Sequence, residues 1–366
     1  MRVGLLTYGM ETQLTGIGRY AQELSYHIRQ VDPSIAVFLI NPYPDSALAW
    51  YRDFPVIPVP QLKKLPAVLT IGHHVIAGVA KRHRLDVVHD PCGIAPFLAV
   101  GNFKRVVTIH DAIPLIYPKL YPLLGNMVFR TTIPLSRWTT DAVITDSNSA
   151  KEDLVRFAKI PKEHISVIYP GVRQYTWQQI EEWRSKSEEL KAQYNITEPY
   201  FLYVGAINPR KNVSRIIEAT RIVNQNGIRV TLVMVGPDRP QVGNGDNIKY
   251  LGYVDEEWLH ILYANARAVL MPSLYEGFGF PVVEAMAHGT RVISSNTSSL
   301  VEVGGTETVY VDPDDTVGWV GAIKSVSVDV ESAMDRFRAK SHRFSWTQVA
   351  TETADIYRMV RVATSV

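Results

Sequence analysis

The sequence contains only one cysteine, Cys92, in 366 residues. A disulfide within the chain is therefore excluded, and so is a zinc site built from several cysteines. This scarcity suits a reducing compartment, and we expect a cytoplasmic protein.

Long hydrophobic runs are lacking as well. Met1–Tyr8 carries one positive charge and an apolar run too short for a signal peptide, and it predicts a first β-strand instead. Residues 65–80 contain no Asp, Glu, Lys or Arg, but they fall short of the roughly 20 apolar residues that a membrane span needs. We therefore expect a soluble protein.

A strong excess of either charge is also missing, since the formal net charge is +2. It is uneven, with +5 on residues 1–172 and −3 on residues 173–366. A basic first half is compatible with an anionic partner or with peripheral contact at the inner face of a membrane. Solvated helix faces such as residues 81–84 explain the excess better, because no apolar face adjoins them. We expect no nucleic-acid partner.

Short apolar runs alternate with helical patterns along the whole chain, which is typical of parallel sheets covered on both faces. The strand candidates are residues 3–7, 37–40, 56–59, 87–89, 106–109, 142–145, 166–168, 201–204, 230–235, 249–251, 268–271, 291–294 and 309–311. The helix candidates are residues 18–30, 66–82, 149–158, 213–224, 256–265, 282–287 and 317–325. These are too many strands for one sheet, so we predict an α/β protein with two doubly wound, Rossmann-like domains.

The boundary between the domains is expected near Tyr169-Pro-Gly171. We assign residues 1–170 to the first domain, 171–198 to a linker with an exposed connecting helix, and 199–345 to the second domain. Ser345 and Gln348 have the spacing of a capping box and open a C-terminal helix over 346–366. Its apolar face predicts packing back toward the first domain.

Two glutamates flank a glycine-rich loop in Glu276-Gly-Phe-Gly-Phe-Pro-Val-Val-Glu284. Pro281 suits the first turn of a helix, and the glycines permit a tight loop with exposed N–H groups just before it. A strand, such a loop and a helix N-terminus together form an anion site. Glu276 and Glu284 are then placed to accept hydrogen bonds from the hydroxyls of one ligand. By itself, the segment also fits an ordinary helix start with two solvated glutamates.

A basic pair follows another strand, in Gly205-Ala-Ile-Asn-Pro-Arg-Lys-Asn212. Ligands of doubly wound sheets bind at the carboxyl ends of strands. Arg210 offers a forked donor to phosphate, and Lys211, expected to be an exposed charge, offers a point charge. They are suited to stabilising the negative charge on a departing diphosphate.

Two further motifs lie in the first half, and only the second directly follows a predicted strand. Gly16-Ile-Gly18-Arg-Tyr-Ala21 matches a dinucleotide-binding pattern only weakly, because no acidic residue follows the second strand. A flexible glycine loop that opens the first helix and faces a ligand explains it better. In Thr108-Ile-His110-Asp111, His110 is expected to donate or accept a proton near neutral pH. Asp111 either caps the following turn or orients an acceptor.

Together and in this order, these segments resemble the retaining glycosyltransferases of group 1, also called family 4, which have the two-domain GT-B fold. The resemblance covers nearly the whole chain. It rests on Thr15–Tyr20, His110–Pro118, Tyr169–Val172, Gly205–Asn212, Leu251–Val254 and Glu276–Glu284. It implies that the first domain binds the acceptor, that the second binds a nucleotide sugar, and that the two face a cleft.

The resemblance also implies roles for the matching residues. Arg210 and Lys211 bind the donor diphosphate. Glu284 holds the ribose hydroxyls, Glu276 holds hydroxyls of the transferred sugar, and His110 touches the sugar. The catalytic group consists of His110, Arg210, Lys211 and Glu276. The further donor contacts are the backbone N–H groups of Phe278, Gly279 and Phe280, Tyr253 and Val254 beside the base, and Gly16 and Gly18 near the phosphate. Asp111 lies on the acceptor side. Many relatives carry an Arg soon after Gly205, whereas Ala206 and Ile207 stand here, so the cationic clamp rests on Arg210 and Lys211.

Retention of the anomeric configuration is implied as well, by same-face attack or by a covalent intermediate with Glu276 as a less favoured nucleophile. We expect no cofactor and no metal. Asp312-Pro-Asp314 has the form of a metal-binding Asp-x-Asp triplet, but its place ahead of a helix favours capping. The alternatives are a nicotinamide-dependent oxidoreductase, a nucleotide-sugar epimerase or hydrolytic relative, and a non-catalytic nucleotide-sugar-binding subunit.

The donor and acceptor are read from the resemblance alone. The sequences of His110–Pro118 and Pro209–Asn212 most resemble those of mannosyltransferases of polysaccharide and cell-envelope pathways. This resemblance favours GDP-mannose as the donor. UDP-sugars stay open. The acceptor is expected to be a glycan or a lipid-linked molecule, and a lipid-linked acceptor implies docking at the inner membrane face.

Overall fold

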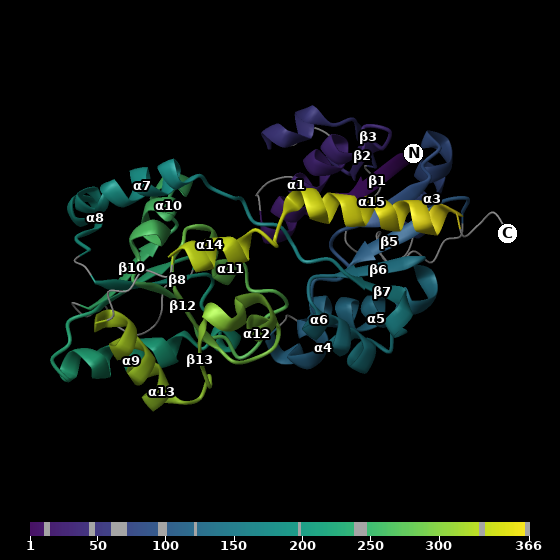
Figure 1. Cartoon of the computed structure of the whole chain (residues 1–366). Coiled ribbons are helices and arrows are strands. Elements are labelled where there is room, and N and C mark those ends of the chain that lie inside the picture. Colours follow the sequence, from purple (N-terminus) through teal and green to yellow (C-terminus); the bar gives the residue numbers. More distant parts are fainter. Residues whose placement is uncertain are drawn as a thin grey trace. The chain divides into compact units, whose positions relative to one another are not determined.

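The computed structural model describes residues 1–10, 15–43, 48–59, 72–93, 101–120, 123–196, 199–237, 247–328 and 334–362. The chain forms two compact units (Figure 1). Unit 1 comprises Met1–Gly171 and Ser345–Val366, and unit 2 comprises Val172–Phe344. The chain thus leaves unit 1 once and returns to it for the C-terminal helix.

Unit 1 is built on a seven-stranded sheet in the order β3-β2-β1-β4-β5-β6-β7. All of its neighbouring strands pair in parallel. The strands are β1 Arg2–Leu6, β2 Ala36–Asn41, β3 Val56–Pro58, β4 Val87–Asp90, β5 Lys104–Thr108, β6 Ala142–Thr145 and β7 Ile165–Val167. The direction of winding reverses between β1 and β4, which is where doubly wound sheets bind ligands.

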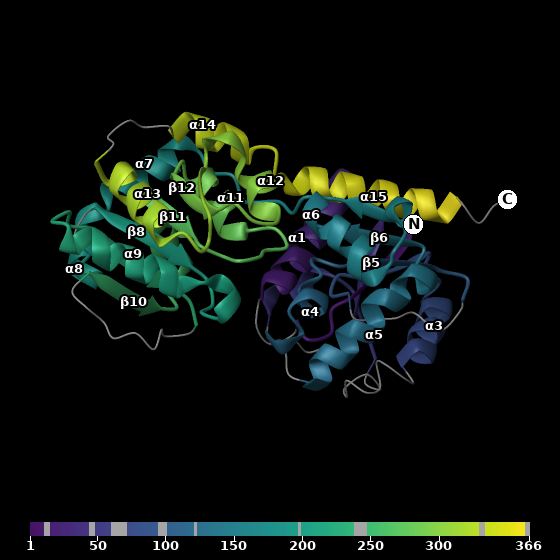
Figure 2. The ribbon, with the colours of Figure 1, turned by 90° about the horizontal axis from the view of Figure 1, so that it is seen from below.

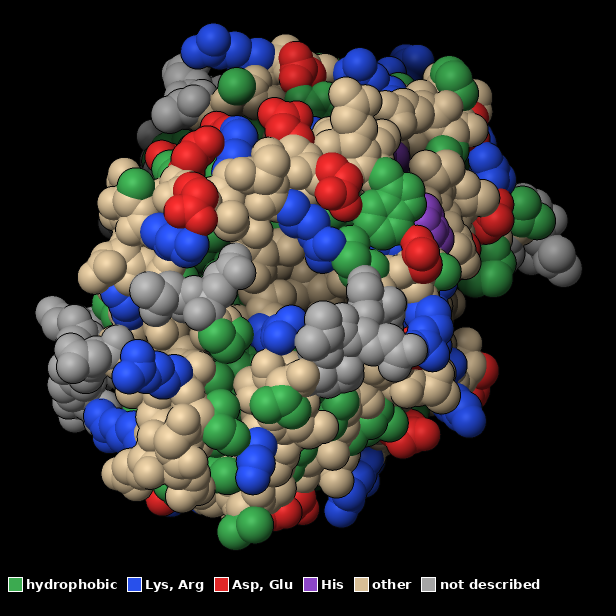
Figure 3. Space-filling model, turned by 60° about the vertical axis from the view of Figure 1, so that its left-hand side comes forward, with side chains coloured by type: hydrophobic (Ala, Val, Ile, Leu, Met, Phe, Trp, Pro, Cys, Tyr) green, Lys and Arg blue, Asp and Glu red, His purple; other side chains and the backbone are tan. Residues whose placement is uncertain are grey.

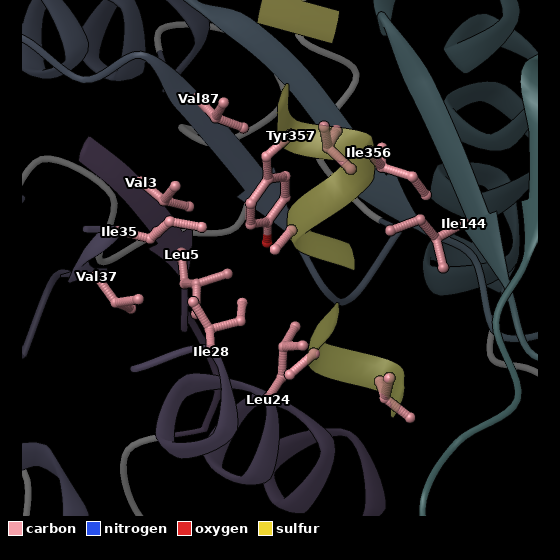
Figure 4. Packing of buried hydrophobic residues seen from close by; sticks show 14 of the residues in the cluster. Val3, Leu5, Leu24, Ile28, Ile35, Val37, Val87, Ile144, Ile356 and Tyr357 are labelled. Carbon is pink, nitrogen blue, oxygen red and sulfur yellow. The ribbon is translucent and has the colours of Figure 1, made fainter. Parts of the chain in front are cut away.

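Helices cover this sheet, and the last of them comes from the end of the chain. The helices are α1 Gly16–Val31, α3 Gly72–His83, α4 Ile113–Ile116, α5 Leu123–Thr139, α6 Asn148–Asp153 and α15 Trp346–Val362. Leu154–Ala158 continues α6 as a wider π-helical turn, and single 3₁₀ turns lie at Ala49–Asp53, Pro118–Leu120 and Lys162–His164. Helix α15 lies beside α1. Its Tyr357 points toward Leu5 of β1, and Ile356 belongs to the same core as Leu24 and Ile28 of α1 (Figure 4).

A close contact fixes the place where the chain leaves unit 1. A Cβ atom added to Gly171 would lie 2.5 Å from the Cγ atom of Trp346 and 2.6 Å from its backbone nitrogen. No side chain fits there, so the Pro-Gly sequence before the exit lets the first turn of α15 pack directly on the backbone. The contact joins the exit of the chain to its point of return.

Unit 2 contains a six-stranded parallel sheet in the order β10-β9-β8-β11-β12-β13. The strands are β8 Tyr200–Val204, β9 Thr231–Val235, β10 Ile248–Gly252, β11 Ala268–Met271, β12 Val292–Ser295 and β13 Val309–Val311. Winding reverses between β8 and β11. These two neighbours therefore mark the switch point of the second sheet.

Helices lie on both faces of this sheet. They are α7 Trp177–Ser185, α8 Ser187–Tyr194, α9 Val213–Gln225, α10 Glu256–Asn265, α11 Phe280–Ala287, α12 Ser299–Gly304, α13 Thr316–Val328 and α14 Met334–Ser341, with 3₁₀ turns at Pro209–Lys211 and Gly305–Glu307. Helices α9 and α13 lie side by side (Figures 1 and 2). They share one core with alternate residues of the strands, such as Phe201 and Tyr203. On the opposite face, the buried Tyr200 donates to the carbonyl of Leu262 in α10.

The two doubly wound parallel sheets and the C-terminal helix on unit 1 confirm the predicted fold class, and every predicted strand overlaps an observed one. Some details differ. The expected connecting helix over 178–193 is two helices, α7 and α8, which pack on α10. Helix α6 is capped by Ser147, whose hydroxyl accepts from the Ala150 N–H, and not by Ser149. The first part of the predicted helix 66–82 lies outside the described residues.

The surface agrees with the absence of a strong net charge. On the face shown in Figure 3, basic and acidic side chains are interspersed, and hydrophobic side chains are scattered between them. Among the helices that the structure describes, none is long and apolar enough to cross a membrane.

Candidate active site

The loops after β8 and β11 meet at the switch point of unit 2. Strand β8 ends at Val204 and β11 at Met271, and the two strands are parallel neighbours. Their carboxyl ends therefore lie at the same edge of the sheet, so Gly205–Asn212 and residues 272–279 are brought together. The backbone joins them directly, because Leu274 donates its N–H to the carbonyl of Arg210 over 2.8 Å.

Three charged side chains converge between these loops. Lys211 Nζ lies 2.7 Å from Glu276 Oε1, and Arg210 Nη1 lies 3.0 Å from Glu276 Oε2. The exposed fractions are 13% for each cation and 9% for Glu276, so the expectation that Lys211 is an exposed charge is wrong. Arg210 also donates to the carbonyl of Tyr275, which fixes its guanidinium. Both basic residues are thus held in place by the loop that they face.

The cluster keeps a positive charge. Burial raises the pKa of Glu276, but the charges of Lys211 and Arg210 outweigh it and lower the pKa below its ordinary value. Glu276 is therefore an ionised acceptor at neutral pH. Two cations against one carboxylate leave one net positive charge at a mostly buried site, which favours an anionic ligand.

The sequence Asn-Pro-Arg-Lys-Asn builds the turn that carries the cations. Asn208 Oδ1 accepts from the Lys211 N–H at 3.2 Å, and Pro209 begins the 3₁₀ turn. Asn212 ends the turn in the left-handed conformation, at φ 50°, which asparagine tolerates better than most residues. Helix α9 starts at the next residue, Val213. Arg210 and Lys211 are therefore presented by a tight turn capped at both ends.

The entrance to α11 provides the second half of the anion site. Gly279 has φ 105°, and a Cβ atom there would lie 2.8 Å from Leu300, so the position requires glycine. Helix α11 begins at Phe280 with Pro281 in its first turn. In the part of the chain that the structure describes, the N–H groups of Phe278, Gly279 and Phe280 have no hydrogen-bond acceptor. Unpaired N–H groups at a helix N-terminus are what a phosphate or sugar oxygen binds.

Glu284 lies one turn into α11, on the helix that this loop opens. Its Oε2 accepts a hydrogen bond of 2.7 Å from the hydroxyl of Tyr263 in α10. The half-buried carboxylate is thus oriented by a side chain that the sequence did not indicate, since Tyr263 looks like an ordinary buried residue of a helix. Tyr253 and Val254 follow β10, the edge strand, which lies two strands from β8. Tyr253 is 72% exposed, and the structure does not bring it into the cluster.

In unit 1, the predicted His110 follows β5 and contacts residues that directly follow the two neighbouring strands, β4 and β6. Its Nδ1 lies 2.8 Å from Asp146 Oδ2, beyond the end of β6. Its Nε2 lies 2.9 Å from the carbonyl oxygen of Pro91, beyond the end of β4. Tyr20 of α1 packs edge-on against the ring. Asp146 was not predicted, although its place at the end of the strand next to β5 was a usable signal.

These contacts determine the charge of His110. A carbonyl and a carboxylate only accept, so both ring nitrogens must carry hydrogen and the ring is an imidazolium. Burial lowers its pKa, but the charge of Asp146 and the hydrogen bonds to Asp146 and Pro91 raise it to about 9. The expectation that His110 exchanges a proton near neutral pH is therefore wrong. In contrast, the buried His89 meets the hydroxyls of Tyr357 and Thr108, and burial lowers its pKa to about 3.

The remaining predicted residues of unit 1 have local partners. Asp111 Oδ1 accepts from the N–H of Ile113 at 2.8 Å, so it caps the turn that opens α4. The two glycines lie inside the first turn of α1 and not in a loop ahead of it. Gly18 is buried, and its N–H donates to Thr15 Oγ1 at 3.2 Å. Gly16 is exposed, and a Cβ atom added to it would approach no other part of the structure within 4 Å.

The Asp-x-Asp triplet closes a turn after β13. Asp312 Oδ1 accepts from the Asp314 N–H at 2.8 Å. The cap of α13 is the next acidic residue, Asp315, whose Oδ1 accepts from the Gly318 N–H at 2.9 Å. The predicted capping of this helix start is therefore present, but it is performed by Asp315, one residue beyond the triplet. Within the described ranges, no group of three His, Cys, Asp or Glu side chains is arranged to hold a metal ion.

Comparison with known proteins agrees with this geometry. The pattern described as glycosyl transferases group 1 matches residues 186–340, and that described as glycosyltransferase family 4 matches residues 14–174. O-antigen chain mannosyltransferase B of Escherichia coli is 28% identical over 98% of this chain and 100% of its own length. O-antigen chain mannosyltransferase RfbU of Salmonella typhimurium is 30% identical over 76% of this chain and 82% of its own length.

Solved structures share the fold over nearly the whole length. Sucrose-phosphate synthase from Thermosynechococcus elongatus superposes with a TM-score of 0.76 at 20% identity, covering 99% of this chain and 100% of that protein. HepE of Anabaena, in complex with UDP-glucose, gives a TM-score of 0.74 at 18% identity, covering 98% of this chain and 100% of that protein.

Two doubly wound parallel-sheet units of this topology form the GT-B fold. The chain belongs to the group 1, or family 4, glycosyltransferases. This membership decides against a nicotinamide-dependent oxidoreductase.

Proposed function

We propose that the protein is a retaining hexosyltransferase that moves mannose from GDP-mannose to a glycan or lipid-linked acceptor, without a metal ion. The observation that carries the proposal is the cluster of Arg210, Lys211 and Glu276 opposite the unpaired N–H groups of residues 278–280. Two fixed cations and three amides suit a diphosphate better than an uncharged ligand. The two curated relatives described above are mannosyltransferases, which supports mannose.

In the proposed reaction, the bond between the anomeric carbon and the diphosphate breaks as the acceptor oxygen attacks from the same face. The acceptor proton passes to the departing diphosphate, so no protein base is needed. Arg210 and Lys211 stabilise the charge that grows on the leaving oxygens. Both oxygens of Glu276 are occupied by these cations, which argues against Glu276 as a covalent nucleophile and for a role in holding the cations and sugar hydroxyls.

The proposal also assigns roles to Glu284 and to residues of unit 1. Glu284, oriented by Tyr263, binds the ribose hydroxyls, and Tyr253 and Val254 lie beside the base. His110 supplies a fixed positive charge to the sugar instead of a transferable proton. Gly16 and Gly18 contact the phosphate, and Asp111 belongs to the acceptor side. UDP-sugars remain the second donor class, because HepE of Anabaena has been solved with UDP-glucose.

Product analysis tests the proposal. The protein is incubated with radiolabelled GDP-mannose or UDP-glucose, each with and without a mannose-containing oligosaccharide, and the glycosidic linkage of the product is determined by NMR. We expect label in the oligosaccharide only with GDP-mannose, and an α-linkage, the configuration of the donor. Conversion of the donor sugar without any acceptor would instead favour an epimerase or hydrolase, and an inverted linkage would refute retention.

The metal requirement is tested in the same assay. We expect the rate to be unchanged after treatment with EDTA, because the cations of Arg210 and Lys211 take the place of a metal at the diphosphate. Loss of activity with EDTA and rescue by manganese would contradict this part of the proposal.

A further inference from the structure

Three consecutive hydroxyl side chains after β12 hold the loop that carries Glu276. Thr297 Oγ1 donates to the carbonyl of Ser273 over 3.0 Å. Ser299 Oγ lies 2.9 Å from the carbonyl of Glu276 and 3.0 Å from that of Phe278, and its single hydrogen is shared between them. The middle residue, Ser298, differs from both, because its Oγ accepts a hydrogen bond from the Glu276 N–H over 2.8 Å.

The backbone of Ser298 has an unfavourable conformation. Its φ is 46° and its ψ is −137°, a combination that glycine adopts readily and residues with a Cβ atom rarely do. A serine at this position is therefore less favourable for folding than a glycine would be. Backbone strain of this kind is concentrated at functional sites, so it supports the hypothesis that the serine side chain has a function.

The hydroxyl of Ser298 has an unused donor at the edge of the anion site. As an acceptor from Glu276, the oxygen keeps its own hydrogen, and among the described residues no acceptor for that hydrogen is present. The residue is partly exposed. It adjoins the backbone of Glu276, whose side chain meets Arg210 and Lys211. A donor group placed here adds to the cations and to the amides of the α11 entrance.

We propose that Ser298 is a donor-binding residue, whose hydroxyl donates a hydrogen bond to an oxygen of the nucleotide sugar. The inference rests on the function proposed above and names a contact that the Glu276–Glu284 motif does not include. The oxygen belongs to the diphosphate or to a hydroxyl of the sugar, and both accept in the same way.

Binding measurements on the full-length protein test the inference. Titration calorimetry with GDP, UDP, GDP-mannose and UDP-glucose first identifies the nucleotide that the parent binds. Ser298→Ala removes the hydroxyl and keeps the strain, whereas Ser298→Gly removes both. For each variant we expect about tenfold weaker binding of the nucleotide sugar, which is typical of one lost hydrogen bond to a polar ligand. A diphosphate contact weakens binding of the nucleoside diphosphate equally, and a sugar contact leaves that binding unchanged.

The control and the thermal midpoint separate ligand contact from loop support. Thr297→Val removes the neighbouring bond of the same loop but no proposed ligand contact, so its affinity is expected within twofold of the parent. Ser298→Gly is expected to unfold at the same temperature as the parent or higher, because the strain is gone. Unchanged affinity in both Ser298 variants, or an equal loss in Thr297→Val, would overturn the inference alone. A parent that binds none of the four compounds would overturn the proposed function together with it.

Discussion

The carboxylate of Glu276 organises the donor site through charge. It is buried, ionised and paired with two cations, so each of the three side chains depends on the others. Removing one member leaves a charge without its partner in a poorly solvated place, which costs stability as well as activity. A substitution of any of the three residues is therefore expected to lower both activity and stability.

Lys211→Ala is the direct test of this coupling. We expect turnover to fall by about 10²–10³-fold, because one of two charges that stabilise the leaving diphosphate is lost. The free energy of unfolding should fall by about 1–3 kcal/mol, since Glu276 keeps only Arg210. Initial rates and urea unfolding measure the two effects. Lys191→Ala, which removes an exposed lysine paired with Glu188, is the control and should change stability by less than about 0.5 kcal/mol. Full activity in Lys211→Ala would refute the phosphate role.

His110 predicts a pH dependence of stability. Its pKa rises from 6.5 in the unfolded chain to about 9 in the folded protein. The stabilisation is therefore complete below pH 6.5 and is lost as the pH rises through 9, with a total of roughly 3 kcal/mol. Urea unfolding of the parent and of His110→Gln at pH 6, 7.5 and 9 should give a difference that shrinks with rising pH. A constant difference would show that His110 is neutral in the folded protein.

The sequence indicated which residues gather at the site but not their charge states. Arg210, Lys211, Glu276 and Glu284 belong to local motifs next to strands, and strand order places them together. Asp146 stands 36 residues from His110, and no local pattern links the two. Whether a buried histidine is neutral, like His89, or cationic depends on partners that only the packed structure identifies.

At the scale of elements, strands were easier to predict than helices. Strands buried on both faces appear as short apolar runs, a signal that a single sequence carries. Helix α5 was not predicted, because Pro134 lies in its interior and Gly125 near its start. Proline cannot donate to the carbonyl four residues earlier, so the sequence argues against the helix that tertiary packing stabilises.

The contact between Gly171 and α15 gives a prediction for an element. Gly171→Ala would place a methyl group 2.5 Å from Trp346, so α15 must shift away from the sheet. We expect a loss of about 1–3 kcal/mol, typical of overpacking. Gly321→Ala in α13 is the matched control, because a Cβ atom there meets nothing within 4 Å. It should stabilise by about 0.5–1 kcal/mol, since alanine favours a helix. Thermal unfolding of both variants checks the contrast, and equal midpoints would contradict the packing.

At the scale of the molecule, the chain is divided between two units that have separate hydrophobic cores. Unit 1 needs the C-terminal helix, because Val349, Ile356 and Tyr357 lie in its core with the strands and α1. Unit 2 has its own core around α9 and α13. The cations and unpaired amides proposed to hold the diphosphate, Arg210, Lys211 and residues 278–280, all belong to loops of unit 2. We therefore expect donor binding to stabilise unit 2 without changing the stability of unit 1.

Scanning calorimetry of the full chain tests this separation. We expect two unfolding transitions, of which a bound nucleoside diphosphate raises only that of unit 2. At a ligand concentration 100 times Kd, binding adds about 2.7 kcal/mol, which corresponds to a rise of roughly 5–10 °C for a unit of this size. Gly171→Ala identifies the other transition, because it should lower that of unit 1 alone. If the ligand raised both transitions equally, donor binding would extend to unit 1 or the units would unfold together. A diphosphate that raised only the transition lowered by Gly171→Ala would place the site in unit 1 and refute its assignment to the β8 and β11 loops.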